Sequence, residues 1–265
     1  MAVTEPVSRT EDLILVRRDG GVAHLTMNRP DQFNALSEQM LEALDGTLAA
    51  MASDDQVRVV VIGAAGRAFC AGHDLKQMKA RPQLEFYQAL FARCARLMRR
   101  IQTLPQPVIA RVHGIATAAG CQLVATCDMA VAADIARFAV SGINAGLFCS
   151  SPAVALSRNL TRKQAFEMLV TGEFIDASTA LARGLVNRVV PLAELDQEIS
   201  RLTTTLVAKP AHVLHLGKEL FYRQLEMGTE AAYQLAVQTM ACNMMDDDAQ
   251  EGVGAFIERR PPRWN

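Results

Sequence analysis

The chain has 265 residues, half of them hydrophobic, with 27 Lys and Arg residues against 28 Asp and Glu residues. This length is enough for one large domain with a sizeable core. The sequence has no basic excess that would neutralise phosphates, which argues against nucleic acid as a partner.

A tail and a strand pair are predicted at the start of the chain. Residues 1–12 contain acidic residues and no apolar run, which predicts a flexible tail without a signal or transit peptide. Two strand-like runs, 13–18 and 22–27, flank an Asp-Gly-Gly turn, a pattern typical of a β-hairpin. A helix is predicted next, over 37–52, with Ser37 as its N-cap.

Strands and helices alternate in the following segments. Short apolar runs predict strands at 57–63, 107–112, 128–133 and 185–190, as expected where both faces of a sheet are covered. A long helix is predicted over 83–103. Strands that alternate with helices indicate an α/β core with parallel strands.

After residue 191 the strand signals stop. Consecutive helices are predicted at 192–206, 210–225, 229–245 and 248–259. Their apolar stripes would either pack within the chain or cover a neighbouring subunit. The longest apolar stretch, 115–133, is interrupted by Gln122 and Asp128, and it therefore predicts buried core and no contact with a membrane.

Six cysteines are scattered along the chain, and none forms a C-x-x-C pair. They are most simply interpreted as reduced thiols that pack as small hydrophobic groups. Reduced thiols, with no signal or transit peptide, predict a cytoplasmic location. No metal site is predicted.

Sequence motifs of several large enzyme classes are absent. The chain has no G-x-G-x-x-G, no Walker A loop, no H-E-x-x-H and no G-x-S-x-G. These absences argue against dinucleotide-binding, nucleotide-binding, zinc-protease and serine-hydrolase functions.

Two segments place small residues directly after predicted strands. Residues 66–75 (GRAFCAGHDL) follow the strand 57–63, and residues 113–123 (HGIATAAGCQL) follow the strand 107–112. A small-residue turn that opens toward a helix leaves backbone N–H groups uncovered. Two such turns side by side would form an oxyanion hole, and tight packing alone would explain the same residues.

Several motifs, in order and spacing, resemble the crotonase (enoyl-CoA hydratase/isomerase) superfamily. The resemblance covers about residues 12–260 and is carried by 28–36 (NRPDQFNAL), 67–75 (RAFCAGHDL), 113–128 (HGIATAAGCQLVATCD), 169–190 and 251–260 (EGVGAFIERR). It implies a spiral of ββα turns over 13–195 and a C-terminal helical trimerisation region over 196–265. It also implies a homotrimer or a dimer of trimers. The implied ligands are acyl-CoA thioesters, with coenzyme A present as part of the substrate and no permanently bound cofactor.

The resemblance also implies roles for individual residues. The backbone N–H groups of His73 and Ala119 would form the oxyanion hole. The residues expected to contact CoA are Ala71, Leu75, Phe33 and Ala35, and, from a nearby helix or subunit, Phe256 and Arg259. Either an apolar wall for the acyl chain or helical core packing explains the stripe of Met78, Leu84, Phe86, Leu90 and Phe91.

The sequence departs from the family pattern at two positions. Hydratases of the family activate water with two glutamates, which would stand at Gln122 and Gly142. An amide has no titrating group at neutral pH, and a general acid–base group typically contributes ~10²–10⁴-fold to the rate. Fast enoyl-CoA hydration is therefore not expected. A large gain in hydration on returning both glutamates would show that the scaffold had stayed competent.

Three functions remain open. The first, slightly favoured because both turn sequences look undisturbed, is an enzyme that stabilises a thioester enolate in decarboxylation, isomerisation or slow hydration. The second is a non-catalytic protein that binds acyl-CoA or modulates active relatives. The third is ordinary hydration with an unrecognised acid. Ser150 stands where some family members carry an aspartate, and the His73 side chain would either face the thioester or pack against the protein.

Overall fold

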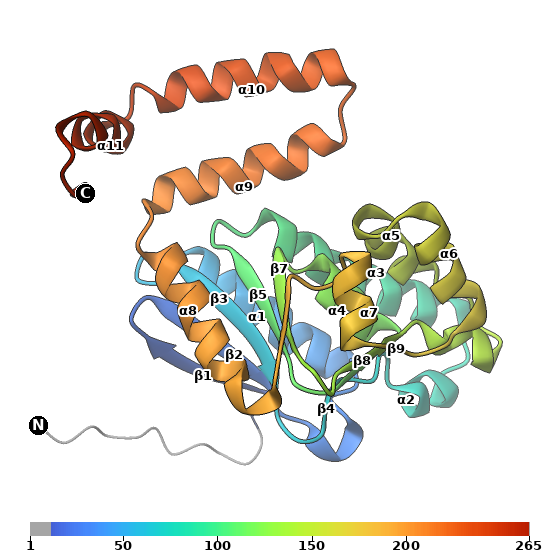
Figure 1. Cartoon of the computed structure of the whole chain (residues 1–265). Helices are drawn as coiled ribbons and strands as arrows, with labels where there is room; N and C mark the ends of the chain where they lie inside the picture. The colour runs from blue at the N-terminus through green and yellow to red at the C-terminus, as the bar shows by residue number, and fades with distance from the viewer. Residues whose placement is uncertain (1–11, 265) are drawn as a thin grey trace, which may run out of the picture.

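The computed structural model describes residues 12–264, so the tail predicted over 1–12 lies almost wholly outside the described residues. Within 12–264 the strands form two sheets (Figure 1). In the first sheet β1 is antiparallel to β2, and all other neighbours are parallel. Its strands are, in spatial order, β1 (Ile14–Asp19), β2 (Val22–Met27), β3 (Val59–Ala64), β5 (Val108–Val112), β7 (Met129–Ala133) and β10 (Arg188–Val190).

The second sheet is built of short strands that follow strands of the first sheet along the chain. They are, in spatial order, β4 (Ala68–Cys70), β6 (Ile115–Thr117), β8 (Arg137–Ala139) and β9 (Ile175–Asp176). The chain passes from β3 to β4, from β5 to β6 and from β7 to β8, changing sheet each time. This repeat is the predicted spiral of ββα turns, and the predicted fold class is confirmed.

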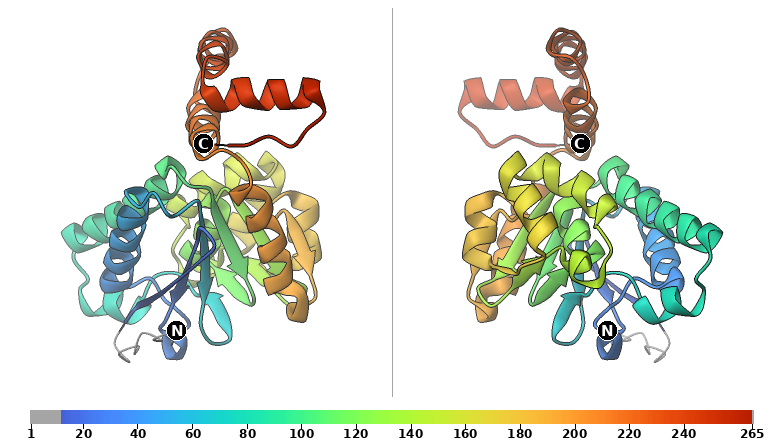
Figure 2. Two further views of the ribbon diagram at one scale, coloured as in Figure 1. Left: turned by 90° about the vertical axis from the view of Figure 1, so that its left-hand side faces the viewer. Right: turned by 90° about the vertical axis from the view of Figure 1, so that its right-hand side faces the viewer.

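Helices cover both faces of the first sheet (Figure 2). Those before β10 are α1 (Glu38–Ala52), α2 (Leu75–Ala80), α3 (Leu84–Thr103), α4 (Ala119–Thr126), α5 (Ser150–Asn159), α6 (Arg162–Thr171) and α7 (Ala177–Arg183). Those after it are α8 (Leu195–Val207), α9 (Ala211–Leu225), α10 (Thr229–Asn243) and α11 (Asp247–Glu258). Short 3-10 turns lie at η1 (Pro30–Gln32), η2 (Ser141–Ala145) and η3 (Leu192–Glu194).

The side-chain alternation of β3 explains why helices are needed on both faces. Val60 and Ile62 belong to the main core, which the helices α1 and α3 share. Val59 and Val61 point to the other face, where they form a second apolar cluster with α8. Because successive residues of a strand face opposite sides, an all-apolar strand is stable only when both sides are covered.

The last three helices form an arm that extends away from the body of the molecule (Figure 1). Neither α9 nor α10 contains a fully buried residue. Lys218 and Tyr222 of α9 both bond to the Asp128 carboxylate, at Nζ–Oδ2 and Oη–Oδ1 distances of 2.6 and 2.7 Å. The Trp264 indole donates to the Ala208 carbonyl at 2.9 Å, and these contacts tie the arm to the body. Among residues 12–264, no helix is long and apolar enough to cross a bilayer.

Candidate functional site

Two strand-to-helix turns are brought together by the pairing of the short strands. β4 and β6 are parallel neighbours, with Ala68 opposite Ile115 and Cys70 opposite Ala116. Adjacent parallel strands end at the same edge of a sheet, so the turns that follow β4 and β6 lie side by side. The first turn leads to α2, where the Asp74 carboxylate caps the helix at 3.1 Å from the Gln77 amide nitrogen.

The close approach of the two turns requires glycine. A Cβ added to Gly72 would lie 2.9 Å from Ala118 Cβ and 3.3 Å from the Ala119 nitrogen. A Cβ added to Gly120 would lie 2.2 Å from the Cys70 carbonyl oxygen. The contacts at 2.9 and 2.2 Å are shorter than a Cβ tolerates, so glycine is needed at both positions where the turns meet.

The backbone of Ala118 is held in a conformation that alanine rarely adopts. Its φ of 50° and ψ of −120° place it just before the first residue of α4. The ψ angle of Ala118 sets the plane of the next peptide and hence the direction of the Ala119 N–H. Such strain costs roughly 1–3 kcal/mol and is concentrated at functional sites. Within residues 12–264 the N–H groups of His73 and Ala119 donate no hydrogen bond to another part of the chain.

A cavity of about 430 Å³ lies at these turns. Six of the predicted site residues line it, namely Ala71, His73, Leu75, Ala119, Gly142 and Ser150. Of the predicted acyl wall, Met78 and Phe91 line the cavity, whereas Phe86 and Leu90 are buried in the core and Leu84 is 65% exposed. A larger groove of about 840 Å³ lies between the β1–β2 hairpin and α8, and none of the predicted residues lines it.

The other predicted residues lie outside the cavity. Phe33 is partly exposed, with the Arg67 guanidinium 4.5 Å above its ring, and its carbonyl accepts the Ala71 amide at 3.0 Å. Ala35 is buried in the same segment. Phe256 lies in α11 and Arg259 directly follows this helix. In Figure 1, α11 lies far from α2, α4 and α5, which contribute residues to the cavity.

Sequence reasoning missed several polar groups at the site. Ser141 and Asn144 line the cavity from η2, and Ser141 Oγ is 2.8 Å from Thr117 Oγ1. The fully buried Asn34 side chain donates to the carbonyls of Ala65 and Ala68, both at 2.9 Å, and holds the loop before α1. These residues lie in irregular backbone, which has no periodic pattern that would single them out.

The two positions of the missing glutamates differ in their surroundings. Gln122 lies inside α4, is 4% exposed, and its Oε1 has no hydrogen-bond partner among the described residues. Gly142 lines the cavity, but an added Cβ would lie 2.6 Å from Leu147 O and 2.7 Å from Cys149 Sγ. The double substitution Gln122→Glu and Gly142→Glu therefore does not test whether the scaffold has stayed competent for hydration. Any side chain at residue 142 has to displace the loop 147–149.

We expect Gly142→Ala to lower the free energy of unfolding by ~1–3 kcal/mol, because overpacking shifts the adjacent backbone. Urea denaturation measures this change. The control is Gly46→Ala in α1, where the added methyl meets nothing within 4 Å. There, alanine should stabilise the helix by about 0.5–1 kcal/mol. Equal changes in the free energy of unfolding for Gly142→Ala and Gly46→Ala would show that the loop 147–149 moves aside without destabilising the protein.

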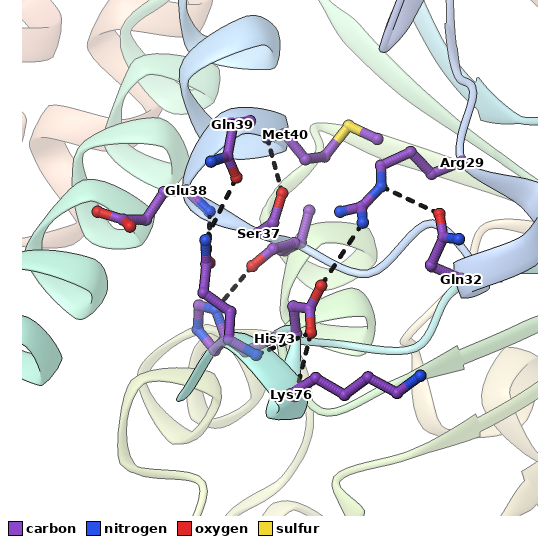
Figure 3. A network of polar contacts seen from close by, with 11 residues as sticks. Arg29, Gln32, Ser37, Glu38, Gln39, Met40, His73 and Lys76 are labelled. Atoms are coloured by element: carbon purple, nitrogen blue, oxygen red, sulfur yellow. Dashed lines mark hydrogen bonds and ion pairs between the residues drawn. The ribbon is translucent and has the colours of Figure 1, made fainter. Parts of the chain in front are cut away.

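The His73 ring is half-buried between the start of α1 and α3. Its Nδ1 lies 3.3 Å from the Leu36 carbonyl oxygen, and its ring meets the Phe91 ring edge-on at a centroid distance of 5.4 Å. Figure 3 shows the surrounding polar network, in which Ser37 caps α1 at the Met40 amide. Burial lowers the pKa of the imidazole, and the contact with the Leu36 carbonyl offsets part of this effect.

We expect His73 to titrate below the ordinary histidine pKa of about 6.5, as an NMR titration of the ring would measure. As the pH falls, the unfolded chain takes up this proton first, so stability declines as the pH falls through about 6.5. His73→Gln should remove that part of the decline. A ring midpoint at or above 6.5 would contradict the buried position.

Comparisons with known proteins point to one family. The Enoyl-CoA hydratase/isomerase family profile matches residues 17–265. Enoyl-CoA hydratase domain-containing protein 3 of Xenopus laevis is 45% identical over 95% of this chain and 86% of its own length, and the human protein is 43% identical over 94% and 82%.

Solved structures give the same result. A crystal structure of enoyl-CoA hydratase from Mycobacterium smegmatis is 62% identical, with a TM-score of 0.95 over 96% of this chain and 99% of that one. Human enoyl-CoA hydratase domain-containing protein 3 is 43% identical, with a TM-score of 0.91 over 95% and 100%.

The comparisons contradict the predicted cytoplasmic location. The relatives from Xenopus laevis, rat, mouse and human are named mitochondrial. The prediction was wrong because reduced cysteines report only that a compartment is reducing, which does not single out the cytoplasm.

The close meeting of the two turns, the spiral of paired strands and these matches lead to one conclusion. The chain belongs to the crotonase, or enoyl-CoA hydratase/isomerase, family.

Proposed function

We propose that this protein binds acyl-CoA thioesters and stabilises a thioester enolate with the backbone N–H groups of His73 and Ala119. One observation carries the proposal: the first turn comes so close to Ala119 that residue 72 has no room for a Cβ. Two adjacent amides, free of partners within residues 12–264, can both donate to one oxygen that gains negative charge. Burial in a small cavity strengthens such hydrogen bonds.

CoA would enter along the first turn. Ala71 and the 63% exposed Leu75 lie at the cavity, and Phe33 and Ala35 lie on the segment bonded to that turn. Since α11 is far from the cavity of its own chain, Phe256 and Arg259 would contact a CoA bound to a second copy. Arg259 could pair with a phosphate of that CoA.

The arm supports a homotrimer or a dimer of trimers. Its helices expose large apolar side chains, among them Phe221, Leu225, Tyr233, Val237, Met240, Phe256 and Ile257. Exposed apolar surface of this extent marks an interaction site, and residues 196–265 would form the trimerisation region. Light scattering should therefore give a mass that is a multiple of three chains.

Efficient enoyl-CoA hydration is not part of the proposal. Among the described residues that line the cavity there is no Asp or Glu, and Ser150 is a poor base. Decarboxylation, isomerisation and slow hydration remain the candidate reactions. The same acid-free lining favours a second candidate function, namely non-catalytic acyl-CoA binding or modulation of active relatives.

Calorimetry and a panel of thioesters test the proposal together. The purified protein should bind butyryl-CoA with micromolar affinity and turn over at least one enoyl-, malonyl- or methylmalonyl-CoA faster than buffer does. Binding without any turnover would select the non-catalytic function. The absence of binding would eliminate both.

A further inference from the structure

The cavity beside the two amides has few groups that can exchange a proton. Among the residues that line it there is no Asp, Glu, Lys or Arg, and only His73 and Cys149 titrate. Burial raises the pKa of the Cys149 thiol, so this group stays protonated at neutral pH. We propose that the His73 imidazole is the catalytic base that takes and returns a proton at the α-carbon of the bound thioester. This inference rests on the proposed function.

The contacts of the ring determine which nitrogen is available. A carbonyl oxygen only accepts hydrogen bonds, so Nδ1, 3.3 Å from Leu36 O, carries the proton. The second nitrogen, Nε2, then holds a free electron pair, as a base requires. The edge-on Phe91 ring restricts the plane of the imidazole. The ring is thus held in one tautomer and one orientation.

Burial, and not a neighbouring charge, keeps the imidazole neutral. The charged and titratable groups on the neighbouring elements include Arg29, Glu38 and Lys76 (Figure 3), the helix cap Asp74, Tyr87 and Arg93 on α3, and Cys149 before α5. The Asp74 carboxylate is engaged by the α2 amides and by Arg29 at 3.6 Å, and the Tyr87 hydroxyl donates to the Met78 carbonyl at 3.1 Å. None of these groups contributes to the lowered pKa of His73, which results from burial. The ring is therefore unprotonated at neutral pH and free to act as a base.

The proposed step is balanced without a further reactant. Nε2 removes the α-proton, and the C–H electron pair becomes the enolate, whose oxygen accepts the N–H groups of His73 and Ala119. The imidazolium exchanges this proton with solvent and then returns a solvent-derived proton to the same carbon, so the net result is exchange at the α-carbon. With a 3-enoyl thioester, return to the γ-carbon moves the double bond to the 2-position. Hydration differs because it adds water and needs a second acid–base group, which this cavity lacks.

The backbone amide and the side chain of His73 can be tested separately. His73→Gln and His73→Ala keep the N–H at 73 and remove the imidazole. The exchange rate is measured as deuterium uptake at the α-carbon of butyryl-CoA in D₂O, and mass spectrometry detects the uptake. Both variants should lose ~10²-fold or more of the wild-type rate and keep the affinity for butyryl-CoA within a few-fold. Added imidazole should restore exchange in His73→Ala, which a packing defect would not allow.

The pH profile adds a second readout. The wild-type rate should rise through an inflection below pH 6.5, and His73→Gln should lack it. His24→Gln is the matched control, because burial also lowers the pKa of His24 but this side chain lines the groove beside α8. It should leave rate and profile unchanged.

Each outcome separates this inference from the proposed function. Wild-type exchange that persists in both His73 variants would overturn the role of the imidazole and leave the oxyanion hole standing. Butyryl-CoA binding without wild-type exchange would also overturn it, in favour of non-catalytic binding. A wild-type protein that does not bind butyryl-CoA would refute the proposed function itself.

Discussion

An ester in place of the amide at residue 119 is expected to slow α-proton exchange by about 10²–10³-fold, the usual effect of losing one oxyanion donor. Replacing Ala119 by lactic acid keeps the methyl side chain and exchanges only the N–H for oxygen. The strained Ala118 backbone sets the direction of this N–H, and Ala119 is 1% exposed. Ground-state affinity for butyryl-CoA should change far less, because the negative charge on the oxygen develops only in the enolate.

The matched control for this ester lies in the same chain. Ala177 is also an alanine, is fully buried, and is also the first residue of a helix, α7. An ester at residue 177 also removes a backbone N–H at the start of a helix. It also makes the carbonyl of the preceding residue a weaker hydrogen-bond acceptor, as the ester at residue 119 does. It should leave exchange within a few-fold of wild type. Equal losses at 119 and 177 would mean that the effect comes from helix stability, and the oxyanion assignment of Ala119 would be wrong.

Lys218→Met is expected to lower the free energy of unfolding by about 3–5 kcal/mol, because it leaves a buried carboxylate without its counter-ion. The Lys218 and Asp128 side chains are only 7% and 13% exposed. The ammonium also donates to the carbonyls of Ile101 and Gln106 at 2.7 and 2.9 Å, and both would lose a partner. Urea denaturation measures the change.

Two further variants decide whether the buried charge is responsible. Adding Asp128→Asn to Lys218→Met should recover part of the loss, because the amide is neutral. Its single oxygen can still accept from the Val108 N–H, and its NH2 group can donate to the Tyr222 hydroxyl oxygen. Arg158→Met removes an exposed ion pair with Glu226, whose side chains are 51% and 64% exposed, and should change stability by about 0–1 kcal/mol. Similar losses for Lys218→Met and Arg158→Met would rule out a special role for burial.

The longer elements were predictable because local pattern and packing agree. The strand predicted at 22–27 is β2 with the same bounds, and Ser37 caps α1 as expected. The strand predicted at 185–190 is shorter, since only Arg188–Val190 pairs with β7 while Leu185 and Val186 are buried outside the sheet. The second sheet was not found from periodicity, because strands of two or three residues are too short to show an alternation. Only the family resemblance implied it.

The sequence by itself determined which chemical groups the protein has: two small-residue turns after strands, and no carboxyl group at 122 or 142. The tertiary structure alone decided which of these groups meet. The parallel pairing of β4 with β6 places the turns that contain His73 and Ala119 side by side, and the loop 147–149 leaves no room for a side chain at Gly142. The physical reason is that contacts between distant segments depend on strand pairing and packing, which leave no periodic trace in either segment alone.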